Sequence, residues 1–287
     1  MGLRAFRIAY DGRPFYGFQR QPDVSTVENV LFEGLSELDV VDSPGKPPDG
    51  YTAAGRTDAG VSAIEQTIAF DAPGWLTPRA FNSTLPGAVR VWAQADAPAT
   101  FHATHDALRR EYTYWLYAPT NDGRIAPDRP IDDDLAERAL EALCGSNDMH
   151  NLTPDTRNTR RGLSGRLERD GEFLVVEVAA GGFSRELVRR LITVVRSVGT
   201  GEMSIDRIDR ILGPEPLPGS DGVPPAPPEP LYLSRVVYGM AEFEPDPVAA
   251  DSAAAVFGDR AGSRLAAGRV ACSIAESIAA ESRPQSE

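Results

Sequence analysis

One short stretch of the chain sets an acid and a base between two glycines. Residues 54–61 read Ala-Gly-Arg-Thr-Asp-Ala-Gly-Val, so Asp58 stands between Gly55 and Gly60, and Arg56 precedes it by two positions. Glycine allows the backbone to bend or to approach a ligand closely. No bulky neighbour screens Asp58, so its carboxylate could reach a reacting carbon. The same pattern also fits an Asx turn closed by its own side chain.

Nearly all of the positive charge is arginine, because Lys46 is the only lysine. The chain has 29 Lys and Arg against 42 Asp and Glu, a formal net charge of −13, so repulsion from phosphate is the default expectation. Arginine is nevertheless the side chain that binds phosphate in a forked geometry. The arginines also cluster, which would allow a basic groove on an acidic body. The clusters are Arg109 with Arg110, Arg157 with Arg160 and Arg161, and Arg185 with Arg189 and Arg190.

Composition narrows the class of protein. The 287 residues are enough for one large or two medium domains with a substantial core. Cys144 and Cys272 are far apart, so no disulfide scaffold is expected. His102 and His105 form a His-x-x-His pair, which by itself is weak evidence for metal. No apolar run reaches membrane-spanning length, and the N-terminus has the pattern of a strand rather than of a signal peptide. We therefore expect a cytoplasmic protein with no membrane contact.

The residues before Asp58 predict a strand, an aromatic segment and a helix. Leu3–Tyr10 alternates as a strand does. Residues 15–21, Phe-Tyr-Gly-Phe-Gln-Arg-Gln, fit either a stacking surface for bases or an aromatic turn packed on its own sheet. Ser25 and Glu28 form a capping box for the helix that follows. Its apolar stripe predicts a core helix and consists of Val27, Val30, Leu31, Leu35 and Leu38.

The residues after Asp58 alternate between strands and helices. Tyr112 and Tyr114 share one face of a strand, where a tyrosine is usually core, but two preceding arginines also fit a ring presented to a flipped base. A helix begins near Ser184, and Arg189 lies at the edge of its apolar stripe, from which it could reach a carboxylate. The other expected elements are strands at Gln66–Phe70, Val89–Ala93 and Leu231–Tyr238, a helix at Leu135–Leu143, and a hairpin that turns at Asp170-Gly171.

The last part of the chain differs in composition from the rest. Past Asp246 it is rich in alanine, serine and acidic residues. Such a composition buries little apolar surface. We therefore expect a tail that is disordered or weakly helical and that catalysis does not need.

Four segments, in order, resemble the TruA family of tRNA pseudouridine synthases. Residues 10–21 are similar to its N-terminal signature, with Phe18 where a Trp is common, and residues 55–63 are similar to its catalytic loop, with Ser62 in place of the usual His. Residues 110–114 and 183–189 are similar to its third and fourth signatures. Each segment alone is weak evidence, but four in sequence are strong.

The resemblance implies an α+β fold with two similar domains, each an antiparallel sheet flanked by helices, and an active cleft between them. On this expectation residues 1–103 form the N-terminal domain with the catalytic loop, residues 104–245 form the C-terminal domain, and residues 246–287 form the tail. The resemblance also implies a homodimer that acts on tRNA, not DNA, without a cofactor or metal.

The reaction implied is the isomerisation of uridine to pseudouridine in the anticodon stem-loop of tRNA. Asp58 would be the essential carboxylate, which either attacks C1′ or removes the proton from C2′, and Arg189 would pair with it and keep its pKa low. Tyr112 would stack on or cover the uracil, and its hydroxyl is a candidate acid or base. The remaining residues expected to bind the substrate are Arg56, Arg110, Phe18 and Gln19.

Two other functions fit the same residues. A catalytically inactive RNA-binding protein would keep the arginine clusters without needing Asp58. A two-carboxylate hydrolase would use Asp58 with Asp11 or Asp106 and would release a product. The mass of the RNA separates the classes, since isomerisation leaves it unchanged.

Overall fold

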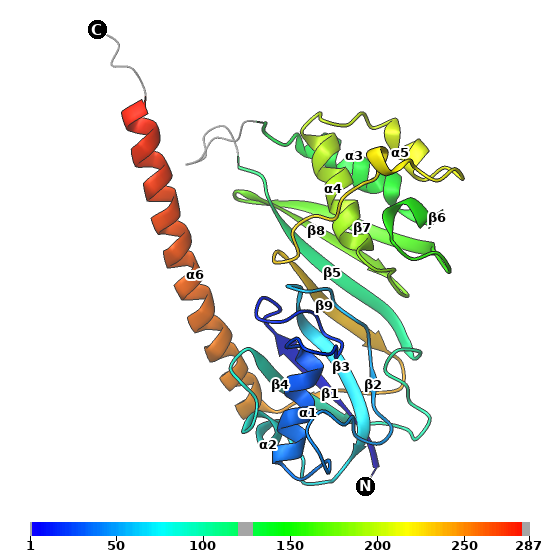
Figure 1. Ribbon diagram of the computed structural model, residues 1–287, viewed down its shortest axis with the longest axis vertical. Helices are drawn as coiled ribbons and strands as arrows, with labels where there is room; N and C mark the ends of the chain where they lie inside the picture. The colour runs from blue at the N-terminus through cyan, green and yellow to red at the C-terminus, as the bar shows by residue number, and fades with distance from the viewer. Residues whose placement is uncertain (1, 120–128, 283–287) are drawn as a thin grey trace.

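A single large sheet dominates the computed structural model, which describes residues 2–119 and 129–282 (Figure 1). Its strands follow the order β10-β4-β1-β3-β9-β5-β8-β7-β6, and β2 pairs with β3. Every pairing is antiparallel except that of β3 with β9. The strands are β1 (Gly2–Tyr10), β2 (Thr52–Ala53), β3 (Ser62–Ala72), β4 (Val89–Asp96), β5 (Ala107–Tyr117), β6 (Gly145–Asp148), β7 (Arg160–Asp170), β8 (Phe173–Ala180), β9 (Leu231–Tyr238) and β10 (Glu244–Pro245).

Helices lie against both halves of this sheet, so the mixed α+β class is confirmed. Figure 1 shows α1 and α2 beside the N-terminal strands, and α3, α4 and α5 beside the C-terminal strands. The helices are α1 (Val27–Glu37), α2 (Pro78–Asn82), α3 (Asp133–Leu143), α4 (Leu187–Gly199), α5 (Arg207–Ile211) and α6 (Pro247–Ser282), with short 3-10 turns η1 (His150–Leu152) and η2 (Gly219–Asp221). The apolar stripes predicted for α1 and α4 both contribute to the core.

The start of α1 differs from the expected capping box. The N-cap is Thr26, whose side-chain oxygen accepts from the backbone N–H of Asn29, and not Ser25. Glu28 turns away from a capping role, since its carboxylate accepts from Tyr51 Oη at 2.9 Å and from Arg20 N at 2.7 Å. Tertiary contacts therefore redirect the acid that the local pattern assigned to the cap.

The two halves of the sheet meet along a very short ladder. The parallel pairing of β3 with β9 covers only Ser62 with Tyr232 and Ala63 with Leu233. Where this ladder stops, two side chains replace it. Glu65 accepts from Val236 N at 3.1 Å and is ion-paired with Arg7, which in turn donates to Val236 O at 3.2 Å. The Arg7–Glu65 pair thus binds both backbone polar groups of Val236 and fastens β9 to the N-terminal half.

Replacing Glu65 by alanine is expected to lower the free energy of unfolding by about 3 kcal/mol, because it leaves a largely buried guanidinium without its partner. Burial lowers the pKa of Arg7 to about 10, so Arg7 stays charged at neutral pH and cannot escape the penalty. Urea unfolding measures the loss.

A matched control for Glu65→Ala is Glu177→Ala. Glu177 pairs with Arg166, whose side chain is 69% exposed, so its loss should cost only about 0–1 kcal/mol. Equal losses for the two variants would show that the Arg7–Glu65 pair does not support the joint.

The tail is helical, one of the two expected alternatives, and the first turns of this helix are packed on the body. α6 is continuous over Pro247–Ser282; residues 283–287 of the expected tail lie outside the described part. Just before it, β10 pairs with β4, and Ala249 and Ala253 are buried against the N-terminal half. The chain therefore returns from β9 to the half in which it began, and α6 extends from there (Figure 1).

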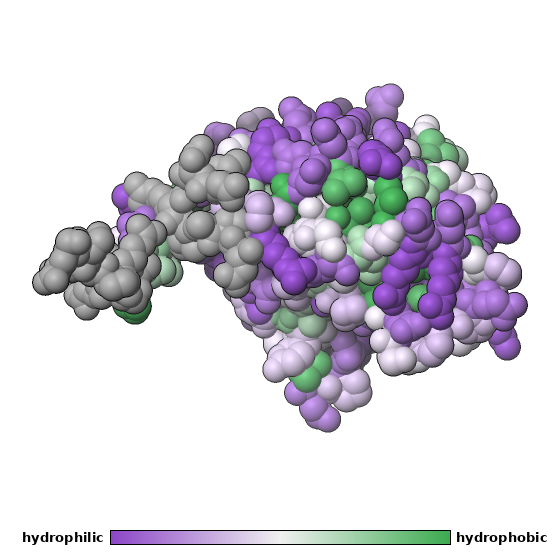
Figure 2. Space-filling view, turned by 90° about the horizontal axis from the view of Figure 1, so that it is seen from above, coloured by the Kyte–Doolittle hydropathy of each residue, from purple (hydrophilic) through white to green (hydrophobic). Residues whose placement is uncertain are grey.

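Hydrophilic residues cover most of the face shown in Figure 2. Within residues 2–119 and 129–282, no helix has both the length and the apolar character required to cross a membrane.

Candidate active site

Asp58 lies on the loop between β2 and β3, and hydrogen bonds fix this loop on both sides. Gln66 on β3 donates to Gly55 O at 2.8 Å, and Val61 N donates to Asp58 O at 3.1 Å. The turn at Gly60 has φ +81°, which favours glycine. Tyr10 at the end of β1 is hydrogen-bonded to Thr57 Oγ1 at 2.8 Å. The residues beside Asp58 are therefore held while its carboxylate remains 30% exposed.

The N-terminal signature, residues 10–21, packs directly against this loop. Gly12 N donates to Ser62 Oγ at 3.0 Å, and a Cβ placed on Gly12 would lie 2.1 Å from Val61 O. Gly17 has φ +99°, and a Cβ there would lie 2.9 Å from Thr57 O. The glycines of the signature thus allow the two backbone segments to lie in direct contact. Residues 10–21 form the surface against which the catalytic loop packs.

Phe18 belongs to this packing surface and not to a surface on which bases stack, which corrects its expected role. Its ring is 1% exposed and stacks on Tyr10 with centroids 6.0 Å apart, while its backbone N–H donates to Thr57 O at 3.1 Å. The pattern of alternating aromatics was compatible with both outcomes, and burial decides for the core. The exposed aromatic of the segment is Tyr16, at 63%.

Gly12→Ala is expected to reduce turnover by about 10²-fold, because the added methyl group must push the backbone at Val61 and displace Asp58 by about 1 Å. The binding of RNA should change much less. Single-turnover kinetics and a filter-binding assay separate the two quantities. Gly74→Ala is the control, since no atom lies within 4 Å of a Cβ placed there. A Gly12→Ala enzyme as active as Gly74→Ala would refute the proposal that residues 10–21 hold the catalytic loop in position.

Arg189 on α4 faces Asp58 from the other half of the molecule. Its Nη1 lies 3.3 Å from Asp58 Oδ2, and its Nε donates to Ala226 O at 2.6 Å. Ala226 N donates back to Arg189 O at 3.0 Å, so the guanidinium is held from behind. The side chains are 15% exposed for Arg189 and 30% for Asp58. The expected pairing is therefore present.

The pKa of Asp58 departs from the expectation in direction. Burial raises it above its usual value, and the charge of Arg189 and its hydrogen bond only partly oppose that rise. Glu186, the αL residue that precedes α4, raises the pKa further. The prediction of a low pKa was wrong because one cation at 3.3 Å does not offset the loss of hydration. The ionised form is consequently a stronger base than an exposed aspartate.

Tyr112 on β5 lies close enough to Asp58 for the two groups to affect each other. Burial raises the pKa of Tyr112 to about 12, with a smaller contribution from Asp58. The ring is 7% exposed and meets Phe183 edge-on, with centroids 5.1 Å apart. Tyr112 is therefore protonated at neutral pH. Phe183 was not assigned a role from the sequence, although it stands in the fourth signature.

Arg110 joins the two halves instead of pointing to solvent. It is 7% exposed, and its guanidinium donates to three backbone carbonyls: Ala54 at 3.0 Å, Thr104 at 2.7 Å, and Gly181. These contacts support a positioning role for Arg110 and not direct contact with a substrate. The side chain connects the residue before the catalytic loop to the end of β8.

Arg56 and Gln19 are exposed on the two segments that meet at Asp58. Among the residues that the structure describes, neither side chain has a hydrogen-bonding or ionic partner. Both therefore remain available to a ligand, as their expected roles require. Within the same part of the chain, no group of three or more His, Cys, Asp or Glu side chains is arranged to hold a metal ion.

The two acids expected as the second carboxylate of a hydrolase both have partners of their own. Asp11 is 4% exposed, and its Oδ2 is paired with Arg260 at 3.1 Å and with Arg264. Asp106 accepts from His102 N at 2.7 Å in its own turn. Asp11 is thus buried and ion-paired, whereas Asp106 is partly exposed and keeps a hydrogen bond within its own turn.

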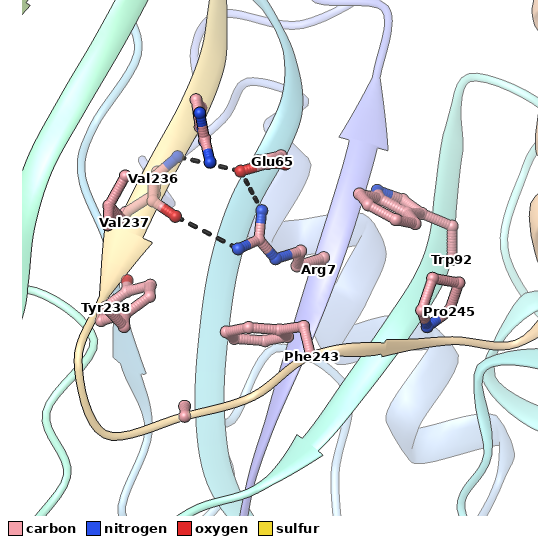
Figure 3. A pocket seen from close by; sticks show the side chains of 10 residues that line it. Arg7, Glu65, Trp92, Val236, Val237, Tyr238, Phe243 and Pro245 are labelled. Carbon is pink, nitrogen blue, oxygen red and sulfur yellow. Dashed lines mark hydrogen bonds and ion pairs between the residues drawn. The ribbon is translucent and has the colours of Figure 1, made fainter.

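A pocket of about 310 Å³ lies at the joint of the two half-sheets (Figure 3). Arg7, Glu65 and Phe243 line it, and the guanidinium of Arg7 lies 4.4 Å from the centre of the Phe243 ring. Neither Asp58 nor Arg189 is among its lining residues. The pocket is thus separate from the carboxylate, and its charged groups already bind β9.

Comparison with known proteins agrees with the four signatures. The family described as tRNA pseudouridine synthase matches residues 139–239. The tRNA pseudouridine synthase A of Haloarcula marismortui is 52% identical over 276 residues, which are 96% of this chain and 100% of the relative. That of Halobacterium salinarum is 56% identical over 257 residues, 90% of this chain and 92% of the relative. A solved Cbf5-Nop10-Gar1 complex contains a chain that matches 80% of this one, over 58% of its own length, at 11% identity and a TM-score of 0.31. On the strength of its curated relatives, the chain belongs to the TruA family of tRNA pseudouridine synthases.

Proposed function

We propose that Asp58 is the catalytic carboxylate with which this tRNA pseudouridine synthase isomerises uridine in the anticodon stem-loop of tRNA. One observation carries the assignment: Asp58 is a partly exposed acid on a loop that packs against residues 10–21, and it lies 3.3 Å from an arginine of the opposite half. Asp11 and Asp106, the other acids considered, are both engaged elsewhere.

The chemistry requires a carboxylate that is ionised although water is largely excluded. The bond between C1′ and N1 breaks, the uracil turns, and C1′ bonds to C5; C5 loses a proton and N1 gains one, so the RNA keeps its mass. Asp58 either attacks C1′ or removes the proton from C2′, and both routes use the ionised form. Burial makes the ionised form more reactive, while the charge of Arg189 lowers the pKa of Asp58 and so keeps the ionised form populated.

The neighbouring residues divide between holding the base and holding the loop. Tyr112, with Phe183 at its edge, forms the surface on which the flipped uracil stacks, and such stacking contributes about 1–3 kcal/mol per base. Arg56 and Gln19 contact the RNA strand from which the base is extruded. Arg110 positions the catalytic loop.

We further propose the arrangement that the family implies: an N-terminal domain of residues 1–103, a C-terminal domain of residues 104–245, an active cleft between them, and a cytoplasmic homodimer. The narrow β3–β9 ladder supports a division near this boundary. The part of the tail that the structure describes, α6, goes with the N-terminal domain, because it contacts β4.

Chemical mapping of pseudouridine in transcribed tRNA incubated with the protein tests the proposal. New pseudouridine in the anticodon arm at unchanged RNA mass supports it. Pseudouridine elsewhere would overturn the target, release of uracil would indicate a hydrolase, and tight binding without modification would indicate an inactive RNA-binding protein.

A further inference from the structure

Asp11 is a buried acid whose charge is balanced from a distant part of the chain. It follows β1 within the N-terminal signature and is 4% exposed. Arg260 Nη1 lies 3.1 Å from its Oδ2, and Arg264 contacts the same oxygen. The nearest cation of its own segment, Arg13, lies 4.0 Å from Oδ1 and is 44% exposed. The arginines of α6 therefore supply most of the compensation for this carboxylate.

The seat of α6 brings these arginines to Asp11. Ala249 and Ala253 are 1% and 6% exposed, so the first turns of α6 are packed. Further along the helix, a Cβ placed on Gly87 would lie 3.5 Å from Val256 Cγ1 and 3.7 Å from Arg260 Nη2. Arg260 and Arg264 are one helical turn apart and share this face. α6 is thus fixed by small residues at its base and by two charges above them.

Asp11 is in turn connected to the catalytic loop through the backbone. Its own N–H donates to Ala88 O at 2.9 Å, and the next residue, Gly12, donates to Ser62 Oγ at 3.0 Å. Gly12 is also in contact with Val61 O, and Val61 N donates to Asp58 O at 3.1 Å. A displacement of Asp11 would therefore move the surface against which the Asp58 loop packs.

We infer that Arg260 and Arg264 of α6 are positioning residues for the catalytic loop, acting through Asp11. This inference rests on the proposed function of Asp58. It also reverses the expectation that catalysis does not need the tail. Without the two arginines, Asp11 would be a buried and poorly compensated charge, and the signature loop would move to hydrate it.

The test compares wild type with Arg260→Gln/Arg264→Gln, with Asp11→Asn, and with all three substitutions combined. We expect the double variant to lose about 10- to 100-fold in kcat with KM changed less than about threefold, because the loop and not the RNA contact is disturbed. Asp11→Asn removes the unpaired charge, so the triple variant should recover most of the lost kcat. A purely structural role for α6 would not produce this rescue.

Two controls keep the outcomes distinct. Arg269→Gln lies on the exposed part of α6 and should behave as wild type. Arg260→Lys/Arg264→Lys keeps both charges and should retain kcat within about threefold, so it reports on the inference even if the glutamine variant unfolds. An increase in KM alone would mean that the arginines bind RNA, and an unrescued triple variant or an unaffected double variant would equally overturn the inference. If wild type itself forms no pseudouridine, the proposed function fails instead.

Discussion

Asp58→Asn is expected to abolish pseudouridine formation, with a loss of about 10⁴-fold or more in the single-turnover rate constant. The amide neither attacks C1′ nor removes a proton, and losses of this size follow removal of a nucleophile or an essential base. Because asparagine has the same shape as aspartate, the catalytic loop should keep its position, and tRNA should bind with an affinity within severalfold of wild type. Rapid-quench assays of modification and a binding titration measure the two quantities.

The control for Asp58→Asn is Asp42→Asn, because the Asp42 side chain is 97% exposed and its ionic partner is the exposed Lys46. It should leave both rate and affinity unchanged. Activity of Asp58→Asn near the wild-type level would end the assignment of Asp58. A parallel loss of tRNA affinity would show that Asp58 holds the substrate rather than converts it.

Arg189→Ala is expected to lower kcat by about 10²–10³-fold, the scale found when a single preorganised electrostatic contact is removed from an active site. It should also lower the free energy of unfolding by up to about 3 kcal/mol, less than for a fully buried pair because Asp58 is 30% exposed. Thermal or urea unfolding measures the second effect. Arg196→Ala, on the same helix with a side chain 52% exposed, is the control and should change neither quantity.

The pH dependence of Arg189→Ala has a definite sign. Arg189 lowers the pKa of Asp58, which burial raises, so removing Arg189 moves that pKa still higher. The acidic limb of the activity profile should therefore shift to higher pH. An acid whose folded pKa exceeds its unfolded pKa lowers the stability of the fold, and this penalty is complete above the folded pKa. It decreases as pH falls from the folded to the unfolded pKa and is absent below the unfolded pKa. The variant should thus regain stability on acidification.

Arg189→Lys keeps the charge but not the donor that binds Ala226, so it should fall between wild type and Arg189→Ala in rate. Its acidic limb should stay closer to that of wild type. An unchanged pH profile in Arg189→Ala would show that Arg189 does not set the ionisation of Asp58.

The sequence was sufficient for elements with a strong periodic pattern. The α4 stripe and the hairpin turn at Asp170-Gly171 lie where their patterns predict, since a buried face and a turn glycine leave few alternatives. It was not sufficient where several partners compete for one side chain. Glu28 left the capping box for Tyr51 and Arg20, and Phe18 turned inward, because burial is decided by residues far along the chain.

The candidate site shows the same limit more sharply. Asp58 and Arg189 are 131 positions apart, and only the likeness to a known family paired them in advance. The direction of the pKa shift was mispredicted, because it depends on how much water the assembled halves exclude. The docking of α6 had no periodic signal either: its base is alanine, and its arginines have meaning only beside Asp11.

The contacts of Arg110 have a consequence for how the molecule responds to ionic strength. Its guanidinium binds carbonyl oxygens of Ala54, Thr104 and Gly181, so no partner in this link carries a formal charge. Dissolved salt screens the attraction between exposed ions that are more than a Debye length apart. It screens the interactions of a buried cation with neutral acceptors much less. Concentrated electrolyte would weaken the exposed ion pairs and the repulsion between RNA and a chain of net charge −13, while the connection that carries the catalytic loop persists.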